Sequence, residues 1–219
     1  MMSKAITLLL ALAGAMSSVQ AQDAAAGQKQ AAMCVGCHGI VGYQSTFPEI
    51  YRVPKVAGQN AAYIVAALTA YKKGERKHPT MRGIGIPLSE QDMADLGAFY
   101  EQQGASPVKP VSDSTPPAPP AAVAELLTKG ACASCHGANY NKPLVPAYPK
   151  LAGQHADYLF ASLRAYGVEG NPHVGRANAI MGGQVKPFKR AELKAMADYL
   201  STLPGDLRVV PNAKFKFIK

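Results

Sequence analysis

The sequence predicts an all-α protein built from two tandem helical domains that a proline-rich linker joins. Three observations support this fold class. A set of short motifs occurs twice in the same order, and the segments between them have the spacing of amphipathic helices. No stretch alternates polar and apolar residues convincingly enough for a strand. With 219 residues the chain is long enough for two small domains.

The composition is that of ordinary globular domains. Hydrophobic residues make up 48% of the chain, and the 17 Pro and 20 Gly punctuate it without a collagen-like period. A collagenous or wholly disordered chain is therefore excluded. Four Cys are too few for a disulfide scaffold of this length, so another role for the cysteines has to be sought.

The N-terminal residues 1–21 are typical of a secretory signal peptide. One basic residue, Lys4, precedes an apolar run over residues 5–16, and the small-residue sequence VQA ends at Ala21. The apolar run is shorter than the roughly 20 residues that a membrane-spanning helix needs, which argues against an anchor. We expect cleavage after Ala21 and a mature chain outside the cytoplasm.

A tandem duplication organises the rest of the chain. The paired motifs are residues 34–39 (CVGCHG) and 132–137 (CASCHG), residues 54–59 (PKVAGQ) and 149–154 (PKLAGQ), and Met81 and Met181. Small changes in the offset between the copies are what loops of variable length produce around one scaffold. We place the first domain at residues 22–104 and the second at residues 122–219, including a basic C-terminal tail. Between them, residues 105–121 hold six prolines and form an extended linker.

Three helices are predicted in each copy. Residues 24–33 and 122–131 are Ala-rich and lead into the cysteine motifs. The middle helices each carry a stripe at i, i+3, i+4 and i+7, over residues 64–71 and 159–166. The last helix of each copy carries the stripes Met93, Leu96 and Tyr100, and Leu193, Met196 and Leu200.

The two last helices differ in their predicted starts. Ser89 and Asp92 resemble a capping box in the first copy. Lys189 and Arg190 stand at the corresponding positions of the second copy, so we expect that helix to lack its cap.

The two CxxCH motifs predict covalent haem. Two cysteines one helical turn apart can add to the two vinyl groups of one porphyrin, and the next residue is a histidine that can bind the iron. Helices this short and this rich in Ala also leave space in the middle of each domain for such a group. The predicted attachment and proximal residues are Cys34, Cys37 and His38 for one haem c, and Cys132, Cys135 and His136 for the other.

Other uses of paired cysteines fit less well. A zinc ribbon has its CxxC pairs roughly 15 to 20 residues apart, which is far from the separation in this chain. A thioredoxin-like CxxC needs a βαβ unit, and simple disulfides leave the histidine after each pair unexplained.

Methionine is the predicted sixth ligand of each iron. Met81 and Met181 alone are Met in both copies, each in a Gly-rich segment that we expect to be a loop before the last helix. At two other positions Met in one copy is exchanged for Leu in the other, as core packing tolerates. Those pairs are Met93 with Leu193 and Met196 with Leu96.

Two questions about the ligands stay open at this point. His78 and His173 precede the two methionines, so ligation by two histidines is the competing arrangement. A ligating imidazole also needs an acceptor for its other N–H, and the carbonyls of Pro54 and Pro149 are candidates. The alternative is that these prolines only shape a turn.

Taken together, the motifs resemble the di-haem cytochrome c4 family. The resemblance rests on two CxxCHG motifs, two PK(V/L)AGQ segments followed by Tyr63 and Tyr158, and the ending LSEQDMADLGAFY, and it covers the whole mature chain. It implies two cytochrome c-like domains related by a pseudo-twofold, with His/Met ligation and a proline carbonyl that accepts from each proximal His. It also implies a periplasmic carrier of electrons from a quinol-oxidising cytochrome bc complex to a terminal oxidase.

Charge is unevenly divided between the domains. Residues 22–104 carry a net charge of +1 and residues 122–219 a net charge of +7. Such a surplus favours acidic redox partners. In the first domain a positive patch is expected near Met81, although a solvated face explains it equally well. Its members are Lys72, Lys73, Arg76, Lys77 and Arg82.

Some partners are excluded or left open by the sequence. The chain lacks the interleaved aromatic and basic residues of single-strand binders, so we expect no nucleic acid. The basic tail KFKFIK leaves open a peripheral contact with a membrane or with a protein. We expect a monomer.

The expected function is one-electron transfer under a closed His/Met shell, without bond chemistry. The alternatives are an electron-transfer subunit of a larger dehydrogenase, and a di-haem enzyme such as a thiosulfate dehydrogenase or peroxidase. A thiolate-ligated enzyme needs a fifth cysteine, and a peroxidase needs a vacant or displaceable ligand.

Overall fold

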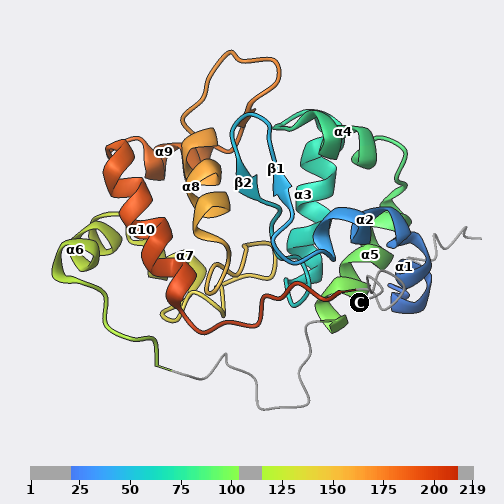
Figure 1. Cartoon of the computed structure of the whole chain (residues 1–219), viewed down its shortest axis with the longest axis horizontal. Helices are drawn as coiled ribbons and strands as arrows, with labels where there is room; N and C mark the ends of the chain where they lie inside the picture. Colours follow the sequence, from blue (N-terminus) through green and yellow to red (C-terminus); the bar gives the residue numbers. More distant parts are fainter. Residues whose placement is uncertain (1–20, 104–114, 212–219) are drawn as a thin grey trace, which may run out of the picture.

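The computed structural model describes residues 21–103 and 115–211, which form two helical bodies packed side by side (Figure 1). The predicted all-α class with two domains is confirmed, although short strands are also present. The predicted signal peptide up to residue 20, much of the linker and the basic tail KFKFIK lie outside the described residues.

The first domain contains five helices in its described part, and its last helix is central. Helix α5 packs against α1 and α3, and α3 also contacts α4. The buried cluster beneath them includes Ile64, Leu68 and Leu96, so the predicted stripes do face the core. In chain order the elements are α1 (Ala24–Gln30), α2 (Ala32–His38), β1 (Gln44–Ser45), β2 (Tyr51–Arg52), α3 (Ala61–Lys73), β3 (Arg76–Lys77), α4 (Pro79–Gly85) and α5 (Glu90–Gln103).

Two glycines of the first domain are required by the backbone. At Gly27, where α1 crosses α5, an added Cβ would lie only 2.1 Å from the carbonyl oxygen of Asp95. Gly74 ends α3 with a φ of 77°, a left-handed conformation that glycine adopts without a Cβ penalty. Gly27 therefore lets the two helix backbones approach closely, and Gly74 turns the chain towards β3.

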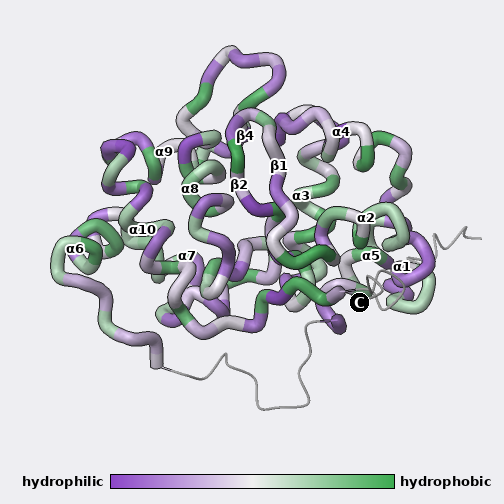
Figure 2. Tube along the Cα trace, in the orientation of Figure 1, coloured by the Kyte–Doolittle hydropathy of each residue, from purple (hydrophilic) through white to green (hydrophobic). Residues whose placement is uncertain are grey.

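The second domain repeats this plan with different details. Helix α10 packs against α8 and α6. The buried cluster includes Leu159, Leu193 and Met196. Its elements are α6 (Ala121–Lys129), α7 (Cys132–His136), α8 (Ala156–Ala165), β4 (Gly175–Arg176), α9 (Ala179–Val185) and α10 (Arg190–Thr202). In Figure 2 the helices of both domains alternate between apolar and polar residues, as helices with one buried face do.

The starts of the two last helices are only partly as predicted. In α5, Ser89 N–H donates to an Asp92 oxygen at 2.8 Å and Asp92 N–H donates to Ser89 Oγ at 3.1 Å, which is the predicted capping box. In α10, Lys189 N–H still donates to Glu192 at 2.6 Å. The expectation of a lost cap is therefore half wrong. The bond from Lys189 N–H to Glu192 is kept, and only the side-chain acceptor that Ser89 supplies in α5 is missing, because a lysine side chain has no acceptor.

In residues 21–103 and 115–211, four strands of two residues each form two small antiparallel sheets, which the sequence did not predict. Strands β1 and β2 pair within the first domain. Strand β3 of the first domain pairs with β4 of the second, with Arg76 opposite Arg176. Segments this short carry no alternation to detect, and the second pair exists only because the two domains dock.

The segment after α10 crosses from the second domain onto the first (Figure 1). Arg208 N–H donates to the Ala57 carbonyl at 3.0 Å, and Val210 packs against the core of the first domain. This segment therefore adds to the interface between the domains. No helix in the described parts of the chain is long and apolar enough to cross a membrane.

Candidate haem-binding sites

The first CxxCH motif lies on α2. Helix geometry places Cys34 and Cys37 one turn apart, and neither thiol is in a disulfide. His38 is the last residue of α2, and its Nδ1 is 2.8 Å from the carbonyl oxygen of Pro54. Because a carbonyl only accepts, Nδ1 must carry the proton, and the lone pair of the ring is then on Nε2.

The second motif repeats this arrangement on α7. Cys132 and Cys135 are again one turn apart and free of disulfides. His136 closes the helix, with its Nδ1 3.0 Å from the carbonyl oxygen of Pro149. Both prolines that the sequence singled out thus lie in hydrogen-bond contact with the predicted proximal histidines.

Burial keeps both predicted proximal histidines neutral. It lowers the pKa of His38, and the positive charge of Arg76 lowers it further, against the opposing effect of the Pro54 carbonyl. Burial likewise lowers the pKa of His136. Since metal binding requires the neutral imidazole, both rings are in the form that binds iron.

The predicted methionines lie on short helices and not in loops, which corrects that detail. Met81 belongs to α4 and Met181 to α9. Each packs against the core cluster of its own domain, as do Cys34 and Cys132. Thiols and thioether thus border one apolar interior in each domain, which is the environment that a porphyrin face requires.

The two competing histidines have other positions. His78 caps α4, and its Nδ1 accepts from Met81 N–H at 3.3 Å. Asn178 caps α9 in the same way, since its Oδ1 accepts from Met181 N–H at 2.9 Å. His173 is exposed in the loop before β4. His78 and Asn178 therefore share the role of helix cap. Because asparagine does not replace histidine as an iron ligand, this shared position argues against His78 as a ligand.

A pair of arginines at the domain interface, Arg76 buried and Arg176 partly buried, was missed by the sequence reasoning. Arg76 was expected in a surface patch, but it is only 9% exposed. It donates to Tyr63 Oη at 3.2 Å and to Tyr158 Oη at 2.5 Å, and Arg176 donates to Tyr158 Oη at 3.2 Å. The signal that was overlooked is the offset of 100 between the arginines, which Met81 and Met181 share.

This pair of arginines carries uncompensated positive charge. In the described residues neither guanidinium forms an ion pair with a carboxylate, and Arg76 Nε is buried without a hydrogen-bond partner. Burial alone would raise the pKa of Tyr158, yet the two arginines lower it to about 7. A group with carboxylates fits this cluster, and haem carries two propionates. The residues present therefore fit two haem groups in both thiol chemistry and charge.

The expected positive patch is correspondingly smaller. Lys72 and Lys73 are exposed near the end of α3, and Arg82 is exposed on α4. Lys77 reaches across the interface and donates to the Asn171 carbonyl at 2.5 Å. With Arg76 buried, the exposed basic side chains of this region are three.

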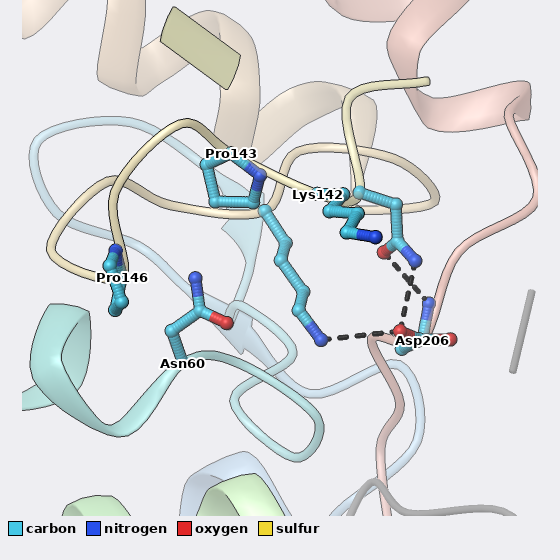
Figure 3. Close-up of a pocket in the computed structure, with 7 residues that line it drawn as sticks. Asn60, Lys142, Pro143, Pro146 and Asp206 are labelled. Carbon is cyan, nitrogen blue, oxygen red and sulfur yellow. Dashed lines mark hydrogen bonds and ion pairs between the residues drawn. The ribbon is translucent and has the colours of Figure 1, made fainter. Parts of the chain in front are cut away.

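A separate hollow of about 300 Å³ lies between the domains (Figure 3). Asp206 at its edge accepts from Asn141 Nδ2 at 2.9 Å and pairs with Lys150 Nζ at 3.2 Å. Asn60 closes its other side from the start of α3. These contacts hold the segment after Pro149 in place.

Two helical domains, each with a free CxxC pair and a histidine held by a carbonyl, define a c-type cytochrome. The profile of the cytochrome c family matches residues 24–103 and 120–204. The chain belongs to this family, and within it to the cytochrome c4 proteins, as the following relatives show.

The relatives match along almost the whole chain. A cytochrome c4 of Azotobacter vinelandii is 33% identical over 92% of this chain and all of its own length. The crystal structure of reduced recombinant cytochrome c4 from Pseudomonas stutzeri has a TM-score of 0.63 at 31% identity, covering 84% of this chain and 100% of that one. A protein of Stutzerimonas stutzeri named thiosulfate dehydrogenase electron acceptor is 30% identical over 89% of this chain and 94% of its own length.

These findings confirm the resemblance that the motifs indicated. The chain is a cytochrome c4-type di-haem electron carrier with two covalent haem c groups, one on the Cys34 and Cys37 pair and one on the Cys132 and Cys135 pair. An electron carrier implies redox partners.

Proposed function

We propose that this protein carries single electrons in the periplasm, from a quinol-oxidising cytochrome bc complex to a terminal oxidase. Each iron supplies one-electron chemistry by cycling between ferrous and ferric states. The protein's part is to hold His38 and Met81 on one iron, and His136 and Met181 on the other, so that no substrate binds directly.

The observation that carries this proposal is that both histidines make the same hydrogen bond from Nδ1 to a proline carbonyl. Each proximal ring has Nδ1 held by a proline carbonyl, which leaves Nε2 for the iron in a fixed orientation. Met81 and Met181 occupy equivalent places on α4 and α9, whereas His78 and Asn178 at the caps are not equivalent in chemistry. A closed shell of one imidazole and one thioether is the arrangement that this supports.

The test of the ligands is a redox titration with optical spectra of the wild type, Met81→Ala and Met181→Ala. We expect each substitution to lower the potential of one haem and to remove half of the thioether–iron absorbance, since a thioether favours ferrous iron. If neither substitution changes the spectrum or a potential, the methionines are not ligands.

Export and partner charge have their own tests. We expect the mature protein to begin at Gln22, which N-terminal sequencing of the periplasmic fraction checks.

The surplus of positive charge on residues 122–219 supports acidic partners. The rate of electron transfer to a terminal oxidase should then fall steeply as ionic strength rises, because salt screens attraction between exposed charges. A rate independent of salt contradicts this.

A second candidate keeps the carrier role and changes the donor. The similarity to the Stutzerimonas stutzeri electron acceptor supports a dehydrogenase of thiosulfate as the electron source. Mixing the oxidised protein with such an enzyme and thiosulfate should reduce both haems if this donor is right. Binding of cyanide or carbon monoxide to the native protein, with turnover of peroxide or of thiosulfate by this protein alone, would overturn the carrier role.

A further inference from the structure

Two buried glutamines form a reciprocal connection between the domains. Gln59 and Gln154 are equivalent in the two PK(V/L)AGQ segments, and each is only 4% exposed. Gln59 Nε2 donates to the Lys150 carbonyl at 3.1 Å, and Lys150 N–H donates to Gln59 Oε1 at 2.9 Å. Gln154 makes the same two hydrogen bonds with Lys55, both at 2.9 Å. Each side-chain amide thus pairs with a backbone segment of the other domain.

The peptide groups that the glutamines hold are the ones that hold the proximal histidines. The Lys150 N–H belongs to the same planar peptide unit as the Pro149 carbonyl, which accepts from His136 Nδ1. In the other direction, Lys55 N–H and the Pro54 carbonyl share the peptide unit that accepts from His38. One peptide therefore separates each glutamine from the proximal histidine of the opposite domain.

Such a chain of hydrogen bonds has a directional effect. An acceptor on the N–H side of a peptide polarises it and makes its carbonyl oxygen a stronger acceptor. A stronger acceptor at Nδ1 orients the imidazole and raises its basicity towards a metal. A more basic ligand favours ferric iron, so the glutamine lowers the potential of the haem in the domain opposite its own.

The glutamines are themselves well fixed. Gln59 Oε1 also accepts from Asn60 N–H at 3.0 Å, and Gln154 Oε1 accepts from His155 N–H at 3.0 Å. These bonds hold each side-chain oxygen at the start of α3 or α8. The neighbouring domain thereby helps to set the orientation of the Pro149–Lys150 and Pro54–Lys55 peptides.

We propose that Gln59 and Gln154 are positioning residues, each tuning the iron of the opposite domain through one peptide group. This rests on the proposed function, because it requires His38 and His136 to be the proximal ligands. Its consequence is that docking of the two domains, and not the individual domain alone, determines the basicity of each axial histidine.

The experiment compares Gln59→Met and Gln154→Met with the wild-type holoprotein. Methionine keeps the side-chain length and removes both hydrogen bonds to the opposite domain, together with the one to Asn60 or His155 in its own domain. The two potentials are measured by redox titration, and each is assigned to its domain from the haem methyl resonances in NMR spectra. Exchange of the Lys150 and Lys55 amide protons reports the lost bonds, with an expected acceleration of roughly fivefold, the factor of one net hydrogen bond.

The expected result is a crossed effect: each substitution changes the potential of the haem in the opposite domain more than that in its own. Gln59→Met should raise the potential of the second domain more than that of the first and shift the His136 Nδ1 proton, and Gln154→Met should do the reverse with His38. The matched control is Glu49→Gln, which removes the interdomain ion pair with Arg164 but touches neither peptide. It should leave the His Nδ1 protons unchanged.

Any uncrossed result overturns the proposal. Shifts confined to the mutated domain, equal shifts in both, no shift, or a crossed shift in only one of the two variants would each do so. If a methionine variant does not fold, Gln59→Asn and Gln154→Asn, whose amides are too short to span the gap, carry the same expectation. Failure of the proposed function is separate: the wild type would then lack two reversible one-electron steps.

Discussion

The two domains support the same motif with differently packed N-terminal helices. In the first domain α1 lies close against α5 at Gly27, and Gln30 Nε2 donates to Asp92 at 2.6 Å. In the second domain the position corresponding to Gly27 is the exposed Glu125 of α6. Helix α6 is held by the buried side chains of Val123 and Leu127. Close backbone contact and a side-chain hydrogen bond hold the N-terminal helix of the first domain, whereas buried apolar side chains hold that of the second.

This difference shows what the site requires of its surroundings. The helix with CxxCH, the proline acceptor and the methionine helix are alike in both copies, while the supporting contacts are exchanged. Even the residue before the motif helix differs, since Ala31 is right-handed and Ala131 is left-handed with a φ of 44°. The arrangement of the CxxCH helix, the proline carbonyl and the methionine helix is therefore compatible with more than one outer packing.

The largest expected effect is at the α1–α5 crossing. Gly27→Ala would place a Cβ against the backbone of Asp95, so we expect a loss of about 2–3 kcal/mol in the free energy of unfolding. Glu125→Ala, at the matching exposed site, should change it by less than about 0.5 kcal/mol. Guanidinium unfolding followed by circular dichroism measures both. Equal losses would contradict the difference in packing.

The two interface arginines should affect the two haems unequally. Removing a nearby positive charge disfavours ferrous iron, so Arg76→Met should lower the potential of the first domain by on the order of 1 kcal/mol, roughly 40 mV for one electron. Burial together with the charge of Arg76 lowers the pKa of His38, whereas burial lowers the pKa of His136. Redox titration of Arg176→Met should therefore show a smaller decrease in the second domain; an equal or larger decrease would argue against this asymmetry.

A smaller effect is expected at the starts of α5 and α10. Ser89→Ala removes the hydroxyl acceptor of the capping box and should cost about 1 kcal/mol of stability. Lys189→Ala removes no acceptor and should be close to neutral, because Glu192 bonds to the backbone. Thermal unfolding of both variants checks this. A comparable loss in Lys189→Ala would mean that its side chain stabilises the helix in another way.

A further effect concerns pH and the start of α8. Burial and the charges of Lys55 and Arg52 lower the pKa of His155 to about 4, below the value of about 6.5 in an unfolded chain. As the pH falls from about 6.5 to about 4, the unfolded chain binds the proton first, so stability declines across this window. His155→Asn copies Asn60 of the first domain and removes this contribution.

The measurement is the change in unfolding midpoint between about pH 7 and about pH 4.5. We expect a smaller decrease in His155→Asn than in the wild type. A matching decrease in the two proteins would show that His155 is not responsible.

Much of the architecture was predictable because its signals are local. The stripe of Ile64, Leu68 and Tyr71 is buried as its spacing indicated, and the exchange of Met93 for Leu193 does mark a core position. Arg76 was misplaced because it lies in a run of basic residues, and such runs are usually solvated. The pairing of β3 with β4 and the tyrosines around the guanidinium, Tyr63 and Tyr158, take it out of water.

The sequence by itself determined where the two cofactors attach and that the domain is duplicated, because a covalent attachment site is contained in five consecutive residues. Tertiary structure alone decided which side chains connect the domains. Gln59 and Lys150 are 91 positions apart, and their contact depends on how two folded surfaces dock. No local periodicity encodes such a contact, since its free energy is gained only after both domains have formed.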